Sequence, residues 1–551
     1  MALAYLSSAV QIVLKLALSI AAITAIAAIL PFLAVATYSF PNFDDTTVFA
    51  TIRSFGLFYS IEWYYDWVMS RVTTGTFRVF LAWLSDFLGL NIWQWNQLAS
   101  VIYFSMVPFG VGAILRIVLP ALSWSWTVVL ACLAFVTSLC LVRSSLTFDP
   151  SSTFIYFMSF FTYCLFLAVF YRHARGPHAG WRSGGLLCLV FLLYLGSHEI
   201  ALIAGPMVIA VSFLLSFQLN RGTAAPLATA FPWNRVRIGF HAIPDLDRPS
   251  LIWLTITLVV VTAIAAAIHV FAPNIGRRAG AWALYATDLT LLEAIRHGTD
   301  LFMALAQRLV RLDEPLPLLM GILTFLVAVT TPVRESLKSF GLSFLLLPTV
   351  GFVGVGLTGA IAVIALSGPG QMADRVVHYA LMYGILSMMA AAILLANLAP
   401  FRLIPVSLAR TGAFAVLMVM AWQVWTNGAF ATVRDASLGA GWAYREGVAE
   451  RIAKMEAGAG GTARVHEIER PSHPVSGAGH GPPSEKAYQR NLELSFGLKK
   501  LVFTPCGDSI DPFWCHYRFN PLDGQPPEVL PEGQYEGPRM ELQRKRLAGE
   551  K

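Results

Sequence analysis

The stretch LLCLVFLLYLGSHEIALIAGPMVIAVSFLLSF, residues Leu186 to Phe217, decides the fold class. It is an apolar run of 32 residues, interrupted at its centre by Gly196 to Glu199. A membrane-spanning helix needs about 20 apolar residues, so this run is longer than a single crossing requires. A charged glutamate at the centre of a spanning helix costs about 2.5–3.5 kcal/mol. We therefore predict that the chain turns at Gly196–Glu199 and crosses the membrane twice here.

The composition places the whole chain outside the range of soluble proteins. Of 551 residues, 56% are hydrophobic and 13% are charged, and the mean hydropathy is +0.62. The net charge of +7 is scattered over the loops and forms no pattern typical of nucleic-acid binding. No cleavable signal peptide is evident, so we expect the first span to be retained as an anchor. The predicted class is an all-α polytopic membrane protein.

The loop charges predict the topology. Arg-rich connections at 171–185, 220–250 and 401–410, joined by 331–339, are placed in the cytoplasm by the positive-inside rule. With the double crossing of 186–217, this predicts about 11 transmembrane helices, an N-terminus inside and a C-terminus outside. The other predicted spans are 14–37, 100–121, 124–142, 153–171, 251–272, 316–333, 340–366, 378–397 and 411–427.

The polar segments divide the chain into a transmembrane domain, 1–427, and an extracytoplasmic C-terminal region, 428–551. Within the first, the outer loops 38–99 and 273–315 carry apolar residues at helical spacing with charges between them, which predicts interfacial helices. In the tail, Cys506 and Cys515 are separated by eight residues in CGDSIDPFWC, so we expect a disulfide if this region is outside the cytoplasm.

Four charged clusters are predicted at the outer face: Asp44-Asp45, Asp149, His198-Glu199 and Arg375. Each has an ordinary explanation as turn acids, a helix cap or a snorkelling cation, although the ionisable pair inside an apolar run favours function. Carboxylates deprotonate hydroxyls or hold divalent cations, and arginine binds phosphate in a bidentate manner. Together they indicate transfer from a phosphate-bearing lipid to an acceptor alcohol.

Three motifs resemble a known family. FDDTTVFATIRSFGLF (43–58), YYDWVMSR (64–71) and GSHE (196–199), with the predicted topology, resemble the GT-C class of integral membrane glycosyltransferases. More narrowly, they are similar to the bacterial polyprenyl-phosphate-sugar enzymes of the GtrII-like and DUF6056-like type. The sequence departs from the family pattern in having no glycine before Arg71.

The resemblance implies a bacterial inner (plasma) membrane enzyme that moves a hexose or pentose, with inversion, from a polyprenyl-phosphate donor to an envelope glycan, lipid or protein. Asp44 or Asp45 would be the general base. The substrate-binding residues implied are His198 and Glu199 at the sugar or acceptor, Arg375 and Arg71 at the donor phosphate, Tyr65, and Asp149. A divalent cation, Mg or Mn, would be held by Asp45 and Asp149 if the enzyme needs one.

Two other classes of protein remain open. A transporter or lipid-linked glycan flippase could use the same acids as ion sites, and it is expected to show repeat-related spans and broken helices, whereas this sequence shows one break and no repeat. A membrane acyltransferase would need a His or Ser nucleophile motif, which we do not find.

Overall fold

A computed structural model describes the chain in segments. These are residues 2–38, 43–65, 71–141, 150–173, 181–220, 248–272, 290–331, 333, 345–367, 374–398, 401–438, 440–466, 495–496 and 498–504.

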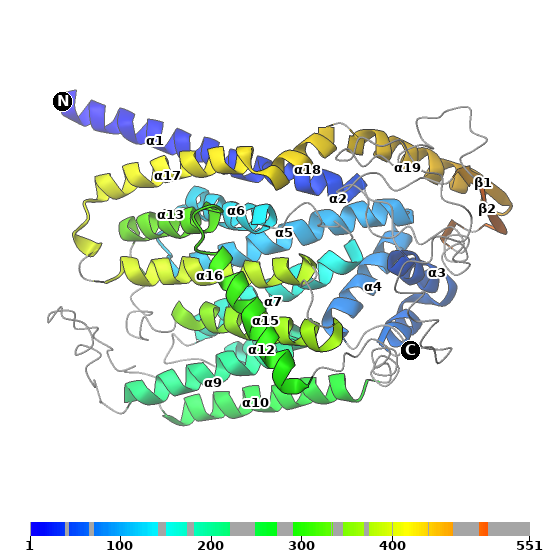
Figure 1. The fold of residues 1–551 in the computed structure, drawn as a ribbon, viewed down its shortest axis with the longest axis horizontal. Helices are drawn as coiled ribbons and strands as arrows, with labels where there is room; N and C mark the ends of the chain where they lie inside the picture. The colour runs from blue at the N-terminus through cyan, green and yellow to red at the C-terminus, as the bar shows by residue number, and fades with distance from the viewer. Residues whose placement is uncertain are drawn as a thin grey trace.

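The described residues form a bundle of helices with one pair of short strands (Figure 1). The first half comprises α1 (Ala2–Ala27), α2 (Leu30–Tyr38), α3 (Phe43–Trp63), α4 (Val72–Phe87), α5 (Ile92–Val118), α6 (Trp124–Leu141), α7 (Pro150–His173), α8 (Trp181–Leu195), α9 (Ala201–Asn220) and α10 (Arg248–Val270). The second half comprises α12 (Leu291–Arg308), α13 (Leu316–Thr330), α15 (Leu347–Ser367), α16 (Asp374–Ala396), the 3-10 helix η4 (Phe401–Leu403), α17 (Val406–Thr426), α18 (Gly428–Leu438), α19 (Ala440–Ala457), β1 (Thr462–His466) and β2 (Lys500–Thr504).

Within the described residues, six helices are long and apolar enough to cross a membrane. They are Lys15–Tyr38, Ile92–Val118, Trp124–Leu141, Ile155–Arg172, Val376–Ala396 and Val406–Thr426. Large apolar side chains also face outward on the bundle surface, among them Leu16 on α1, Val259 on α10 and Met418 on α17. A lipid environment satisfies such a surface, whereas water does not. These features confirm the prediction of a helical membrane protein.

The centre of the bundle is packed with aromatic rings. Phe104 of α5, Phe135 of α6 and Phe157 of α7 meet edge to face, with ring centroids 5.3–5.6 Å apart. Tyr163 of α7 lies so close to α15 that a Cβ added at Gly351 would collide with its hydroxyl oxygen. Only glycine permits this close approach of the two helices.

The break predicted within residues 186–217 is confirmed, whereas the double crossing of the membrane stays a prediction. α8 ends at Leu195, the chain turns through residues 196–200, and α9 begins at Ala201. One predicted boundary is wrong: α5 begins at Ile92 and not near residue 100. The cause is a capping box in which Gln94 N donates to Asn91 Oδ1 and Asn91 N donates to Gln94 Oε1, each at 2.9 Å.

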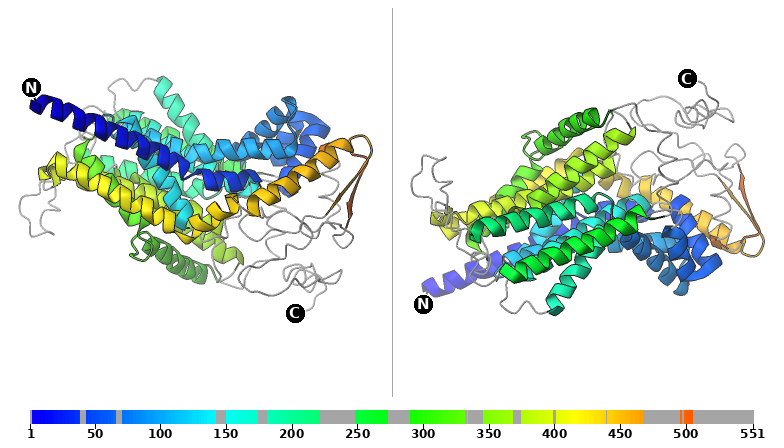
Figure 2. Two further views of the ribbon diagram at one scale, coloured as in Figure 1. Left: turned by 90° about the horizontal axis from the view of Figure 1, so that it is seen from above. Right: turned by 90° about the horizontal axis from the view of Figure 1, so that it is seen from below.

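Several helices and both strands gather at the end of the bundle opposite the N-terminus. α3, α4, α19 and the two strands gather there in both orientations of the molecule (Figures 1 and 2). The helix α12 is amphipathic, with Leu291 and Leu292 exposed and Phe302 and Leu305 buried. The predicted helical character of the segments 38–99 and 273–315 is therefore found in α3, α4 and α12.

The C-terminal region begins against the transmembrane domain. α18 and α19 both pack on α2, Phe430 lies 5.8 Å from Phe32 between ring centroids, and Tyr38 Oη donates to the Ser437 carbonyl at 3.1 Å. β1 then pairs with β2 in parallel, from Thr462 opposite Lys500 onward. The start of this region is thus held by the bundle.

Candidate functional site

The site is built where the start of α4 meets the turn between α8 and α9. The backbone N–H of Thr73 donates to the Gly196 carbonyl at 3.0 Å, and Thr74 Oγ1 donates to the Ser197 carbonyl at 3.1 Å. A Cβ at Gly196 would stand 2.6 Å from Thr73 Oγ1, so the close approach requires glycine. These contacts hold two segments together that are far apart in the chain.

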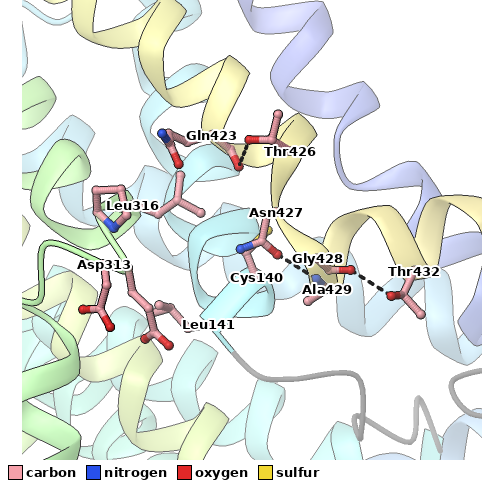
Figure 3. Close-up of a pocket in the computed structure, with 12 residues that line it drawn as sticks. Cys140, Leu141, Asp313, Leu316, Gln423, Thr426, Asn427, Gly428, Ala429 and Thr432 are labelled. Atoms are coloured by element: carbon pink, nitrogen blue, oxygen red, sulfur yellow. Dashed lines mark hydrogen bonds between the residues drawn. The ribbon is translucent and has the colours of Figure 1, made fainter. Parts of the chain in front are cut away.

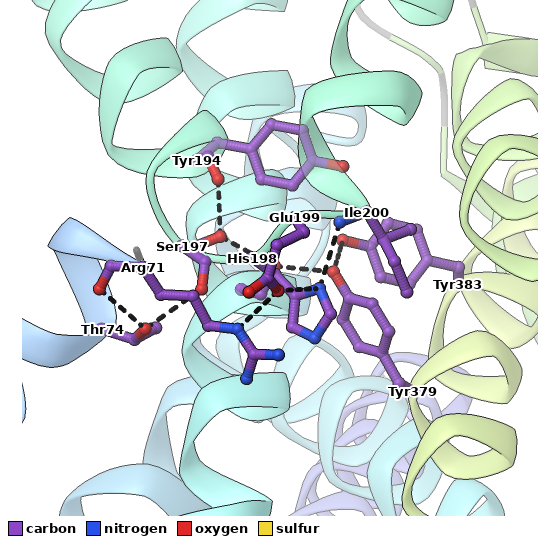
Figure 4. A network of polar contacts seen from close by, with 10 residues as sticks. Arg71, Thr74, Tyr194, Ser197, His198, Glu199, Ile200, Tyr379 and Tyr383 are labelled. Carbon is purple, nitrogen blue, oxygen red and sulfur yellow. Dashed lines mark hydrogen bonds and ion pairs between the residues drawn. The ribbon is translucent and has the colours of Figure 1, made fainter. Parts of the chain in front are cut away.

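An ion pair links the two segments. Arg71 Nε lies 2.5 Å from Glu199 Oε2, and His198 Nδ1 lies 3.5 Å from the same oxygen. The Arg71 and Glu199 side chains are 15% and 33% exposed, so the pair is shielded but reachable. In Figure 4 the two terminal nitrogens of Arg71 point away from the Glu199 carboxylate. The guanidinium thus has a second edge that can bind an anion in a bidentate manner.

The charge state of Glu199 follows from its neighbours. Burial alone would raise the pKa of this carboxyl group, but Arg71 and His198 lower it by more, so the pKa lies below its ordinary value. Glu199 is therefore ionised at neutral pH. An ionised carboxylate orients Arg71 and does not act as a proton donor.

His198 is clamped in place by aromatic rings and by the backbone. Its ring centroid lies 5.2 Å from that of Tyr156 and 5.6 Å from that of Tyr379. The Ile200 N–H donates to His198 Nδ1 at 3.2 Å. These contacts fix the orientation of His198.

A row of hydroxyl groups leads from the turn into the bundle. Ser197 Oγ lies 2.8 Å from Ser159 Oγ, which lies 2.6 Å from Tyr379 Oη, and this lies 3.1 Å from Tyr383 Oη (Figure 4). Hydroxyls that satisfy one another avoid the penalty of burial without a partner. The row anchors the turn on α7 and α16.

A second histidine, which the sequence reasoning missed, lies at the same end of the bundle. Tyr65 Oη donates to the Ile268 carbonyl at 2.7 Å, which joins the end of α3 to the last turn of α10. The next residue, His269, is 3% exposed, and neither ring nitrogen has a hydrogen-bond partner among the described residues. Leaving such a group unsatisfied costs about 1–3 kcal/mol. In the sequence, His269 is recognisable only as a lone histidine near the end of the predicted span 251–272.

The remaining predicted residues are only partly described. Asp44 and Asp45 stand in the first turn of α3, where the helix dipole favours carboxylates, and Arg375 is the second residue of α16. The side chains of these three residues lie outside the described part of the chain. So do Asp149, Cys506 and Cys515.

The structure therefore brings together Arg71, His198 and Glu199 of the predicted set, with Tyr65 anchoring α10 nearby. Arg71 pairs with Glu199 although its motif departs from the family pattern. No group of three or more His, Cys, Asp or Glu side chains among the described residues could hold a metal ion. The predicted cation ligands Asp45 and Asp149 are not in that set, so a cation there stays a prediction.

A hollow of about 530 Å³ lies elsewhere, between the ends of α6, α13, α17 and α18 (Figure 3). It contains none of the predicted residues. Its two carboxylates are already paired, Asp313 with Arg311 at 3.5 Å and Glu314 with Arg308 at 3.0 Å. The predicted site residues that contact one another, Arg71, His198 and Glu199, lie instead at the α8–α9 turn. We therefore place the candidate site at that turn.

Comparisons of the chain with protein-family models, curated proteins and solved structures found no match.

Proposed function

We propose that the protein is a membrane glycosyltransferase of the GT-C type, which moves a sugar from a polyprenyl-phosphate donor to an acceptor hydroxyl on the outer face. The observation that carries the proposal is the Arg71–Glu199 pair beside His198, in which the terminal nitrogens of Arg71 point away from the Glu199 carboxylate. A cation held at a break between apolar helices fits a ligand that has an anionic head and a lipid tail.

The proposed topology has eleven spans with the N-terminus in the cytoplasm. Besides the six long apolar helices, five shorter ones are apolar: Gly184–Leu195, Ala201–Ser212, Ile256–Val270, Leu316–Thr330 and Leu347–Ala362. Six and five supply the eleven crossings. The N-terminus and the site-bearing elements α3 and α4 lie at opposite ends of the bundle, which supports an outer location of the site (Figure 1).

The proposed reaction is a single inverting displacement. Asp44 or Asp45 takes the proton of the acceptor hydroxyl, the hydroxyl oxygen forms a bond to the anomeric carbon, and the bond from that carbon to the phosphate oxygen breaks. Polyprenyl phosphate leaves with the bonding electrons, and Arg71 stabilises its growing negative charge, with Arg375 as a second candidate. Glu199 is a positioning residue for Arg71, and His198 lines the sugar or acceptor side.

Sugar transfer by the purified full-length protein tests this proposal. The donors are polyprenyl phosphates that carry a hexose or a pentose, and the acceptor is a membrane extract of envelope glycans and lipids. Asp44→Asn and Asp45→Asn are measured separately, with Glu450→Gln on α19 as a control that removes an exposed carboxylate. Loss of a general base lowers the rate by about 10²–10⁴-fold.

We expect one aspartate variant to lose transfer while Glu450→Gln retains it. Full activity in both aspartate variants would exclude the base role. A wild-type protein that transfers no sugar but moves the lipid-linked donor between the leaflets of a vesicle would identify a flippase.

A further inference from the structure

His269 is an exception among the buried histidines. It is as buried as His378, at 3% and 2% exposed, but His378 Nε2 has a partner in Ser138 Oγ at 3.0 Å. Neither nitrogen of His269 has a partner among the described residues. Buried polar groups are normally satisfied, so an exception needs an explanation such as a ligand.

The position of His269 ties it to the candidate site. Its helix, α10, packs against α8 and α9, the two helices that flank the turn bearing Glu199. The hydrogen bond from Tyr65 to the Ile268 carbonyl joins this end of α10 to the segment that leads to Arg71. The end of α10 that carries His269 therefore lies beside the segments that carry the ion pair, and among the described residues the imidazole makes no hydrogen bond with it.

The chemistry of the neighbours selects the ligand class. Glu199 already occupies Arg71 Nε, and among the residues drawn in Figure 4 no hydrogen bond reaches the two terminal nitrogens of Arg71. An anion with several oxygens can bind that edge and also accept a hydrogen bond from an imidazole N–H. A phosphate group has this geometry, whereas a sugar hydroxyl offers only a single oxygen to these donors.

We propose that His269 is a ligand-binding residue, which donates a hydrogen bond to the phosphate of the lipid-linked donor beside Arg71. This inference rests on the proposed function for the identity of the lipid. It makes His269, Arg71 and Glu199 one anion site assembled from α10, the start of α4 and the α8–α9 turn.

Binding of polyprenyl phosphate to the full-length protein, compared with binding of the uncharged polyprenol, tests the inference without needing turnover. The variants are His269→Leu and His269→Ala, and His378→Gln is the matched control for loss of a buried histidine. Affinity and the ligand-induced rise in Tm are measured for each.

We expect the wild type to prefer the phosphate. His269→Leu should weaken polyprenyl phosphate binding by about 10- to 100-fold, the range expected for one hydrogen bond to a charged group, and should leave polyprenol binding unchanged. Its Tm without ligand should stay level or rise, because an unsatisfied polar group has been removed. His378→Gln should lower the Tm and keep the preference for phosphate.

A preference for phosphate that survives in His269→Leu overturns the inference, and so does a wild type without any preference. If His269→Leu does not fold, the smaller His269→Ala replaces it, with the same expected loss of phosphate binding. If phosphate binding requires His269 but the wild-type protein transfers no sugar, the proposed function is wrong and the anion site at His269 stands.

Inorganic phosphate as the ligand separates the two sources of the anion. A Tm rise with the lipid alone assigns the site to the carrier. If inorganic phosphate raises the Tm as much as the lipid does, and His269→Leu abolishes this rise, the site binds free phosphate. That result overturns the lipid part of the inference.

Discussion

The Arg71–Glu199 pair should behave as one energetic unit in a double-mutant cycle. The perturbations are Arg71→Met, which keeps most of the apolar stem, Glu199→Gln, which keeps the shape, and the two combined. The atoms Nε and Oε2 are 2.5 Å apart, and the side chains are 15% and 33% exposed. The pair therefore lies between the buried and the exposed extremes for which typical energies are known.

Energies measured for buried and for exposed ion pairs set the limits of the free-energy change expected here. Removing one partner of a buried ion pair costs about 3–5 kcal/mol, and exposed pairs contribute about 0–1 kcal/mol. For this pair we expect each single variant to lose about 1–3 kcal/mol in the free energy of unfolding. The double variant should lose clearly less than the sum, with a coupling of about 1–2 kcal/mol, because neither charge is left unpaired.

Reversible unfolding of the purified protein in mixed micelles measures all four corners of the cycle. The control cycle uses Arg311 and Asp313, which are 3.5 Å apart and 55% and 68% exposed. Its coupling should be below about 0.5 kcal/mol. Additivity of the Arg71 and Glu199 variants to within about 0.5 kcal/mol would refute the reasoning, since it would show that the pair is not formed in the folded protein.

Glu199, Gly351 and the loop charges each give one further prediction. The folded-state pKa of Glu199 is lowered, so its stabilisation is complete above the ordinary glutamate pKa of about 4.3 and is lost as the pH falls. The stability deficit of Glu199→Gln should shrink from pH 5 to pH 3 in unfolding titrations, and a deficit that grows in acid would contradict this. Gly351→Ala should lower the free energy of unfolding by about 1–3 kcal/mol, because its Cβ clashes with Tyr163. The control Gly321→Ala, whose Cβ would lie 3.5 Å from the nearest atom, should be neutral or stabilising. Equal melting temperatures for the two variants would count against the tight packing at Gly351. Reporter fusions at Gly180 and Gly479 should report opposite sides of the membrane, and same-side signals would overturn the eleven-span topology.

Much of the architecture could be predicted because it depends on local sequence. The break at residues 196–200 follows from a Glu and a His inside an apolar run, and its penalty does not depend on the rest of the fold. The amphipathic character of α12 follows from its helical periodicity. The start of α5 was missed because aromatic residues at 92–95 resemble an interfacial segment, and the Asn91–Gln94 capping box was overlooked.

The candidate site depended more on tertiary structure. Sequence identified Arg71, His198 and Glu199 as candidates, but Arg71 and Glu199 are 128 residues apart, and nothing local predicts their contact. The pairing follows from the glycine at 196 and from the hydrogen bonds of Thr73 and Thr74, which exist only once α4 docks on the turn. In the proposed mechanism Glu199 orients Arg71, whereas the family resemblance implied a place at the sugar or acceptor.

The amino-acid sequence by itself determined that this is a helical membrane protein, that the apolar run 186–217 breaks near its centre, and which ionisable residues stand at that break, because hydropathy and charge act on each segment independently. Only the tertiary structure decided which of those charges meet and that His269 lacks a partner among the described residues. A side chain's hydrogen-bond partners are a property of packing, and packing brings together residues that have no relation along the chain.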